Sequence, residues 1–258
     1  MRDGRLGPGR VKRAVRAARH CAWTLALVGG LWFTGSSSAM AETRTLSFYH
    51  THTGERATIT FKRNGRYDEA GLRQMNQFLR DWRRNEVIRM DPALFDLVWE
   101  VYQQSGSRQP IHLVSSYRSP ATNNMLRSRS RGVAKESMHT KGRAMDFFLP
   151  DVPPDRLRAI GLRKQIGGVG YYGGSGFTHL DTGRVRHWPR MTRDQLARVF
   201  PDGKTVHVPS DGKPMPRYQE ALAELQRRGN GRSGTAFASN GGGANDGTNV
   251  KQGNLMAM

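Results

Sequence analysis

Apolar and polar residues alternate along two neighbouring stretches of the chain, 45–50 and 57–62. Alternation with a period of two is typical of a β-strand that buries one of its faces. The two stretches flank Thr53-Gly54-Glu55, a short polar segment with a central glycine, so they are predicted to form a β-hairpin. Two further short strands are predicted from their apolar content, at 111–116 and 143–149.

Elsewhere, apolar residues recur three or four positions apart, which predicts amphipathic helices. Residues 68–84 have this spacing throughout. Asp91 is followed by Pro92, which matches an N-cap with proline at the first helical position, and Gly106 is expected to end that helix. Helices are predicted at 68–84, from 92 to about 104, from 119 to about 130, from 153 to about 164, from 192 to about 200, and from 218.

The stretch from Gly167 to Gly183 contains seven glycines around two apolar runs, and we expect two short strands joined by a tight turn. No internal repeat is visible. Helices and strands are mixed without a regular strand–helix–strand alternation, which indicates the α+β class. Residues 229–258 contain eight glycines and five asparagines with almost no apolar periodicity, so they are predicted to be a disordered tail.

The first 41 residues form a pattern typical of a secretory signal. Seven basic residues within 1–20 precede an apolar run from Cys21 to Phe33, and a segment of small residues ends at Ala41. We expect cleavage after Ala41, export to the periplasm, and no stable membrane insertion afterwards. The alternative is an uncleaved anchor, although 13 apolar residues barely span a bilayer. The folded domain is then 42–228.

The charge of the chain is strongly positive. Lys and Arg number 41 against 21 Asp and Glu, and removing the signal with its seven bases and one acid lowers the net charge from +20 to +14. Such an excess suggests nucleic acid as a partner, but export favours an anionic cell envelope, including the carboxylates of peptidoglycan stem peptides. The alternative is a solvated, arginine-rich surface with no special partner. No nucleic-acid partner is expected.

Signal cleavage also removes Cys21, the only cysteine, so a metal site in the remaining chain must use histidine and carboxylate ligands. Asp146 is predicted on a core-facing strand position, where an unpaired carboxylate is unfavourable. A metal held by His139, Asp146 and His179 would satisfy it and leave a fourth position for water, as in hydrolytic zinc sites. The alternative is a salt bridge to Arg118 or Arg143. Asp181 shares a strand face with His179, so it could accept the water's proton or orient His179.

Several motifs together resemble the zinc peptidases of the D-alanyl-D-alanine carboxypeptidase type, and within them the murein endopeptidase K group. The resemblance extends from about Leu46 to Trp188. Its blocks are Ser115-Ser116-Tyr117-Arg118-Ser119-Pro120, Ser137-x-His139-x-x-Gly142-x-Ala144-x-Asp146, Gly168-x-Gly170-x-Tyr172, and Phe177-x-His179-x-Asp181-x-Gly183-x-x-Arg186-x-Trp188, with His52-Thr53-Gly54-Glu55.

The resemblance implies one Zn²⁺ bound by His139, Asp146 and His179, and a small antiparallel sheet flanked by helices, as in the Hedgehog signalling domain. It also implies that Arg118 stabilises the oxyanion and that Ser137 helps to hold the substrate. Several such peptidases place a catalytic acid three residues before the last ligand, where this chain has Gly176. Asp181 is therefore the expected general base, with His187 and Glu136 as alternatives.

Two aromatic positions complete the expected site. One of the adjacent Tyr171 and Tyr172 could line the peptide groove, and Tyr172 is predicted to bind substrate. Trp188 is interpreted as a packing residue beside Arg186. The predicted function is that of an exported zinc metallopeptidase that hydrolyses peptide cross-links of peptidoglycan. The alternatives are a D-Ala-D-Ala carboxypeptidase, a non-catalytic wall-binding module, or a basic nucleic-acid binder.

Overall fold

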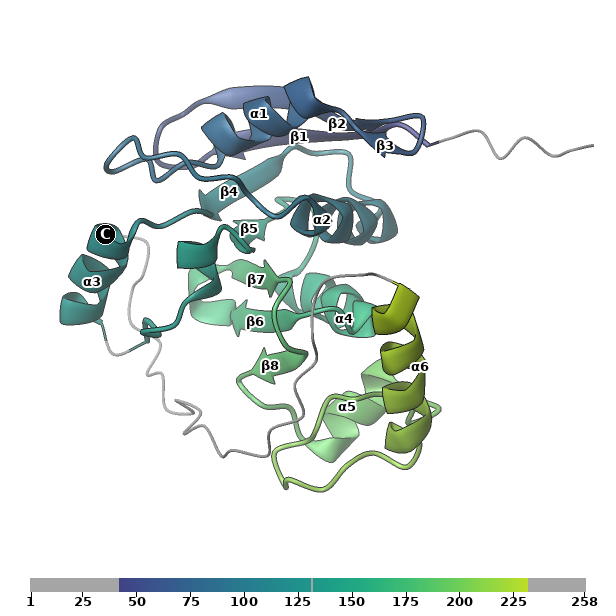
Figure 1. Ribbon diagram of the computed structural model, residues 1–258. Coiled ribbons are helices and arrows are strands. Elements are labelled where there is room, and N and C mark those ends of the chain that lie inside the picture. The colour runs from purple at the N-terminus through teal and green to yellow at the C-terminus, as the bar shows by residue number, and fades with distance from the viewer. Residues whose placement is uncertain (1–41, 131, 232–258) are drawn as a thin grey trace, which may run out of the picture. The chain divides into compact units, whose positions relative to one another are not determined.

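The computed structural model describes residues 42–130 and 132–231 (Figure 1). The expected signal segment, 1–41, lies outside the described residues. The predicted hairpin is confirmed: β1 (Arg44–His50) pairs in antiparallel fashion with β2 (Arg56–Arg63). The turn between them includes Gly54 with φ +73°, a left-handed conformation that favours glycine.

Helices begin where the capping residues of the sequence indicate. In α2 (Pro92–Ser105) the side chain of Asp91 accepts from Ala93 N, and Gly106 at the C-cap is left-handed. Ser119 and Thr192 cap α3 (Pro120–Arg129) and α5 (Arg193–Val199) in the same way, by accepting from backbone N–H groups.

The first predicted helix is shorter than expected, because α1 (Glu69–Phe78) ends well before residue 84. The chain beyond it is held by hydrogen bonds to a distant segment. Leu79 O accepts from Tyr117 N, and the Asp81 carboxylate accepts from both Ser119 N and Ser119 Oγ. These bonds replace the helical ones and bring the 79–86 loop against the segment that carries Arg118.

The strands form one eight-stranded sheet in the order β3-β2-β1-β4-β5-β7-β6-β8. The expectation of a small antiparallel sheet is wrong in two respects, because the sheet is larger and β1–β4 and β6–β8 pair in parallel. The remaining elements are β3 (Arg66–Tyr67), β4 (Ile111–Ser115), the 3₁₀ helix η1 (Met138–Lys141), β5 (Ala144–Phe148), α4 (Pro154–Lys164), β6 (Gly168–Tyr172), the 3₁₀ helix η2 (Gly173–Ser175), β7 (Phe177–Asp181), β8 (Arg186–Trp188) and α6 (Tyr218–Gly231).

Strand β4 pairs in parallel with β1, and parallel neighbours need a long crossover connection. The chain through α1 and α2 supplies it. Helices α2 and α4 contact each other, α1 contacts β2, and α4 contacts β6 and β7, as Figure 1 shows. Their apolar faces and the sheet enclose a core that includes Phe48, Phe95 and Phe147. The α+β class is thereby confirmed.

The last helix, α6, continues to Gly231 and so includes residues 229–231, the first three of the predicted tail. Residues 232–258 lie outside the described part of the chain. Among the described residues, no helix combines the length and apolar character that a membrane span requires.

Candidate metal centre

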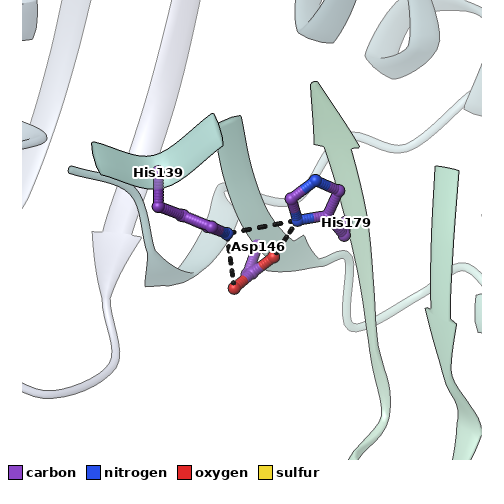
Figure 2. A group of neighbouring side chains, drawn as sticks. All are labelled: His139, Asp146 and His179. Carbon is purple, nitrogen blue, oxygen red and sulfur yellow. Dashed lines mark hydrogen bonds and ion pairs between the residues drawn. The ribbon is translucent and has the colours of Figure 1, made fainter. Parts of the chain in front are cut away.

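Three side chains from different elements meet at one point on the sheet (Figure 2). His139 comes from η1, Asp146 from β5 and His179 from β7. Asp146 and His179 are partners in the register of β5 and β7, which places their side chains next to each other. His179 Nδ1 lies 2.7 Å from Asp146 Oδ1, and His139 Nε2 lies 3.2 Å from both Asp146 Oδ2 and His179 Nδ1.

Three potential metal ligands therefore lie close together. One donor atom from each residue lies within 4.8 Å of the other two, and all three residues are buried. The salt bridge that the sequence offered as an alternative partner for Asp146 is also present in part, since Arg118 Nη2 lies 3.5 Å from Asp146 Oδ2. Arg143 instead pairs with Asp91.

The hydrogen bond on the far side of each imidazole decides which ring nitrogen faces the centre. His139 Nδ1 lies 2.6 Å from Ser116 O, and a carbonyl only accepts, so Nδ1 carries the proton and Nε2 presents its lone pair. His179 Nε2 lies 2.9 Å from Asp181 Oδ2, so its proton is donated there and Nδ1 faces Asp146. Both rings are therefore oriented as metal ligands.

The charge states of His139 and Asp146 also suit a cation. Burial, together with the nearby charge of Arg118, lowers the pKa of His139 to about 4, so its imidazole is neutral at pH 7. Burial would raise the pKa of Asp146, but the adjacent His139 and His179 outweigh it and hold the pKa well below its usual range. A buried carboxylate beside a neutral imidazole with a free lone pair fits a divalent metal ion.

Asp181 is fully buried and lies on the side of His179 that faces away from Asp146. Both of its carboxylate oxygens accept several hydrogen bonds. Its Oδ1 accepts from Gly168 N, Gly183 N and Arg186 Nη1, and its Oδ2 accepts from His179 Nε2 and Arg186 Nη2. A Cβ at Gly168 would lie 2.4 Å from Asp181 Oδ2, so this position requires glycine for the carboxylate to fit. Of the two roles expected for Asp181, the arrangement favours orienting His179.

The two alternative general bases lie in other surroundings. Glu136 is exposed and pairs with Lys141 at 3.4 Å. His187 is buried, accepts from Met191 N, and lies with its ring 5.0 Å from that of His207. Neither belongs to the cluster of three ligands.

Arg118 lies beside the three ligands with its guanidinium almost enclosed, the side chain being 13% exposed. Its Nε is buried and has no hydrogen-bond partner among the described residues. Burial lowers its pKa, although Asp146 opposes that effect. A largely desolvated guanidinium beside the three candidate ligands is suited to an anionic oxygen of a substrate.

Ser137 and Tyr172 are the two expected substrate-binding residues. Ser137 Oγ accepts from His139 N and so caps η1, which fixes the start of the segment that carries His139. Tyr172 ends β6, and its hydroxyl lies 2.9 Å from Trp188 Nε1. The ring of Trp188 in turn lies 4.9 Å from that of His179.

Sequence reasoning missed three contributors to this centre. The Ser116 carbonyl fixes the tautomer of His139, Arg186 holds Asp181, and Trp188 joins His179 to Tyr172. The first leaves no side-chain signal, since any residue has a carbonyl. Arg186 and Trp188 stand in the sequence motif Arg186-x-Trp188, but their place at the site depends on the pairing of β8 with β6.

Comparisons with known proteins match the part of the chain that holds the three candidate ligands. The family described as Peptidoglycan L,D-endopeptidase MepK matches residues 38–188, which include all three candidate ligands. The Peptidoglycan L,D-endopeptidase MepK of Escherichia coli (strain K12) is 46% identical over 145 residues, covering 56% of this chain and 80% of that protein. The Probable peptidoglycan L,D-endopeptidase MepK of Haemophilus influenzae is 41% identical over 146 residues, covering 56% and 78%.

No solved structure matches the chain, so the likeness to the Hedgehog domain stays a prediction. The resemblance to the murein endopeptidase K group is confirmed, because the family match covers more than half of the chain and the matched region contains the candidate metal centre. The chain belongs to the Peptidoglycan L,D-endopeptidase MepK family of metallopeptidases.

Proposed function

We propose that this protein is a zinc-dependent endopeptidase that hydrolyses peptide cross-links of peptidoglycan. The observation that carries the proposal is the convergence of His139 Nε2, Asp146 and His179 Nδ1 within the segment that matches the family. Two imidazoles and one carboxylate are a known ligand set of catalytic zinc, which uses three protein ligands and keeps a position open for water or substrate.

Zinc bound there would lower the pKa of water to about 7 and polarise the scissile carbonyl. The chain's own residues supply the remaining functions. The guanidinium of Arg118 stabilises the negative charge that develops on the carbonyl oxygen. The hydroxyl of Ser137 accepts from His139 N, which leaves its own proton to donate to the substrate peptide. Asp181 keeps His179 in the tautomer that presents Nδ1.

We further propose that residues 1–41 direct export and that the substrate is the cross-linked stem peptide in the periplasm. The positive charge of the chain favours retention on the anionic wall. Sequencing the N-terminus of protein recovered from the periplasm tests this. A start at Glu42 is expected, and a start at Met1 contradicts it.

Replacing Asp181 with asparagine should weaken zinc binding about 10- to 100-fold, the range for loss of an outer hydrogen-bond partner of a ligand. With its oxygen towards Gly168 N and Gly183 N, the amide would turn its N–H group towards His179 Nε2, which could then no longer donate its proton there. Competition with a chelating dye measures the zinc affinity. Asp151→Asn, an exposed carboxylate outside the centre, is the control.

The same variant separates the two roles of Asp181. If Asp181 orients His179, most of the activity returns at saturating zinc. If Asp181 accepts the proton of water, kcat stays about 10²- to 10⁴-fold lower at saturating zinc while the zinc affinity is unchanged, and the orienting role is wrong.

Digestion of defined muropeptides by purified 42–258 tests the proposed function. We expect cross-linked dimers to be cleaved to monomers when zinc is present, and cleavage to stop when a chelator removes it. Mass spectrometry of the products names the bond. Release of terminal D-alanine alone would indicate the carboxypeptidase, and binding to murein without any cleavage would indicate a wall-binding module.

A further inference from the structure

The indole of Trp188 packs at the edge of the candidate metal centre. In the parallel pairing of β8 with β6, Trp188 lies beside Gly170, and a Cβ at that position would come within 2.5 Å of the indole. Glycine at 170 therefore makes room for the ring. The ring packs on His179 at 4.9 Å between centroids, and its Nε1 points to the hydroxyl of Tyr172 at 2.9 Å.

This hydrogen bond has only one possible direction. An indole N–H donates and cannot accept, so the hydroxyl oxygen of Tyr172 is the acceptor. The proton of that hydroxyl must then be donated in another direction. The Tyr172 ring cannot swing freely, because it is stacked on Phe177 with centroids 4.6 Å apart. Trp188 and Phe177 together fix where the Tyr172 O–H points.

The sheet register places Tyr172 on the face of the sheet that carries His179. Gly170 is the β6 partner of His179 on β7, and Tyr172 lies two residues further along the same face of β6. Burial and the Asp146 carboxylate raise the pKa of Tyr172 to about 12, and Arg118 acts in the opposite direction. The hydroxyl is thus protonated at neutral pH and within electrostatic reach of both Asp146 and Arg118.

We propose that Tyr172 is a catalytic residue that donates its hydroxyl hydrogen bond to the oxygen of the scissile carbonyl, opposite Arg118, and that Trp188 is the positioning residue that aims this donor. The inference rests on the proposed peptidase function and assigns a role within it. It assigns this role to Tyr172 and not to Tyr171. The guanidinium carbon of Arg158 lies 5.2 Å from the centroid of the Tyr171 ring.

The step is addition of water to the carbonyl carbon, followed by loss of the amine. A C–O bond forms, the π electrons of the carbonyl move to its oxygen, and that oxygen becomes an oxyanion. The Tyr172 O–H and the Arg118 guanidinium donate hydrogen bonds to it without giving up a proton. When the C–N bond breaks, the amine leaves with the proton that the water released.

Replacing Tyr172 with phenylalanine removes the donor but keeps the ring that stacks on Phe177. The zinc-loaded variant should cleave the muropeptide with kcat lower by about 10²-fold, the effect of losing one oxyanion donor, and with little change in KM. A phosphinate pseudopeptide that replaces the scissile amide should bind more weakly by a similar factor. Zinc content should not change.

Tyr171→Phe is the matched control, because it deletes the same atom from the neighbouring tyrosine. We expect its kcat and phosphinate affinity to equal those of the parent. Trp188→Phe should lower kcat about tenfold and have no further effect in the Tyr172→Phe background, since a positioning residue acts only through the group it aims.

The outcomes separate this inference from the proposed function. A parent enzyme that leaves muropeptides intact contradicts the proposed function itself. An active parent whose Tyr172→Phe variant keeps the same kcat and the same phosphinate affinity contradicts only the role of Tyr172. An additional loss from Trp188→Phe in the Tyr172→Phe background contradicts the positioning role of Trp188.

Discussion

Replacing His179 with alanine should abolish both zinc binding and murein hydrolysis, with activity falling at least about 1,000-fold. The variant loses one of three ligands and the group that separates the carboxylates of Asp146 and Asp181. Metal catalysis supplies many powers of ten to hydrolysis, so its loss leaves little residual rate. Elemental analysis and muropeptide digestion measure the two effects.

Two further variants serve as controls for the His179→Ala result. Asp146→Asn preserves the size and most hydrogen bonds of the second ligand and should also lose the metal. His112→Ala removes a half-buried imidazole from β4, where it packs on Tyr49 and Phe148, and should keep zinc and activity. A His179→Ala protein that digests murein as fast as its parent would show that the proposed centre is not the active site.

Replacing Arg118 with methionine should lower kcat about 10²- to 10³-fold while zinc content stays the same. Methionine fills the volume of the arginine stem but provides no positive charge and no donor for the oxyanion. Arg118 Nη2 also pairs with Asp146 at 3.5 Å, so the metal-free variant leaves that buried carboxylate with one partner fewer and should melt at a lower temperature. In the zinc-loaded variant the metal would balance the carboxylate, and the melting temperature should change little, which differential scanning calorimetry checks.

A matched arginine serves as the control for this variant. The side chain of Arg80 is 15% exposed, against 13% for Arg118, and it pairs with Glu55 outside the centre. Arg80→Met should leave kcat unchanged. A rise in KM without a fall in kcat for Arg118→Met would contradict the oxyanion role and would favour a carboxypeptidase that grips the terminal carboxylate of its substrate.

Local patterns predicted the elements of this fold well. The hairpin 45–50 and 57–62 lies within one residue of β1 and β2 at each end, because alternation is a strong signal. The capping residues Asp91, Ser119 and Thr192 marked three helix starts for a local reason, since each side chain bonds to the backbone of its own helix.

Elements that depend on distant partners could not be predicted in the same way. The end of α1 is set by bonds between the 79–81 segment and Tyr117 and Ser119, which are more than thirty residues away along the chain. Strand β8 has three residues and exists through its pairing with β6. Neither feature has a periodic signal of its own.

The site shows the same division. Residue types and the two-residue period of a strand placed Asp146 on a core-facing position and His179 on a face shared with Asp181, and the ligand chemistry of zinc grouped both with His139 before the resemblance implied the same set. The period also placed Asp181 on the same face as His179. It did not predict on which side of the imidazole the carboxylate lies. That depends on donors from Gly168, Gly183 and Arg186, which enclose the carboxylate away from Asp146.

Anomalous diffraction at the zinc edge, from crystals of the zinc-loaded protein, tests the central claim most directly. A single strong peak is expected within about 2.0–2.2 Å of His139 Nε2, His179 Nδ1 and one Asp146 oxygen, the distances typical of zinc with these ligands. A peak bound elsewhere on the chain, or none between these three side chains at full zinc loading, would contradict the account.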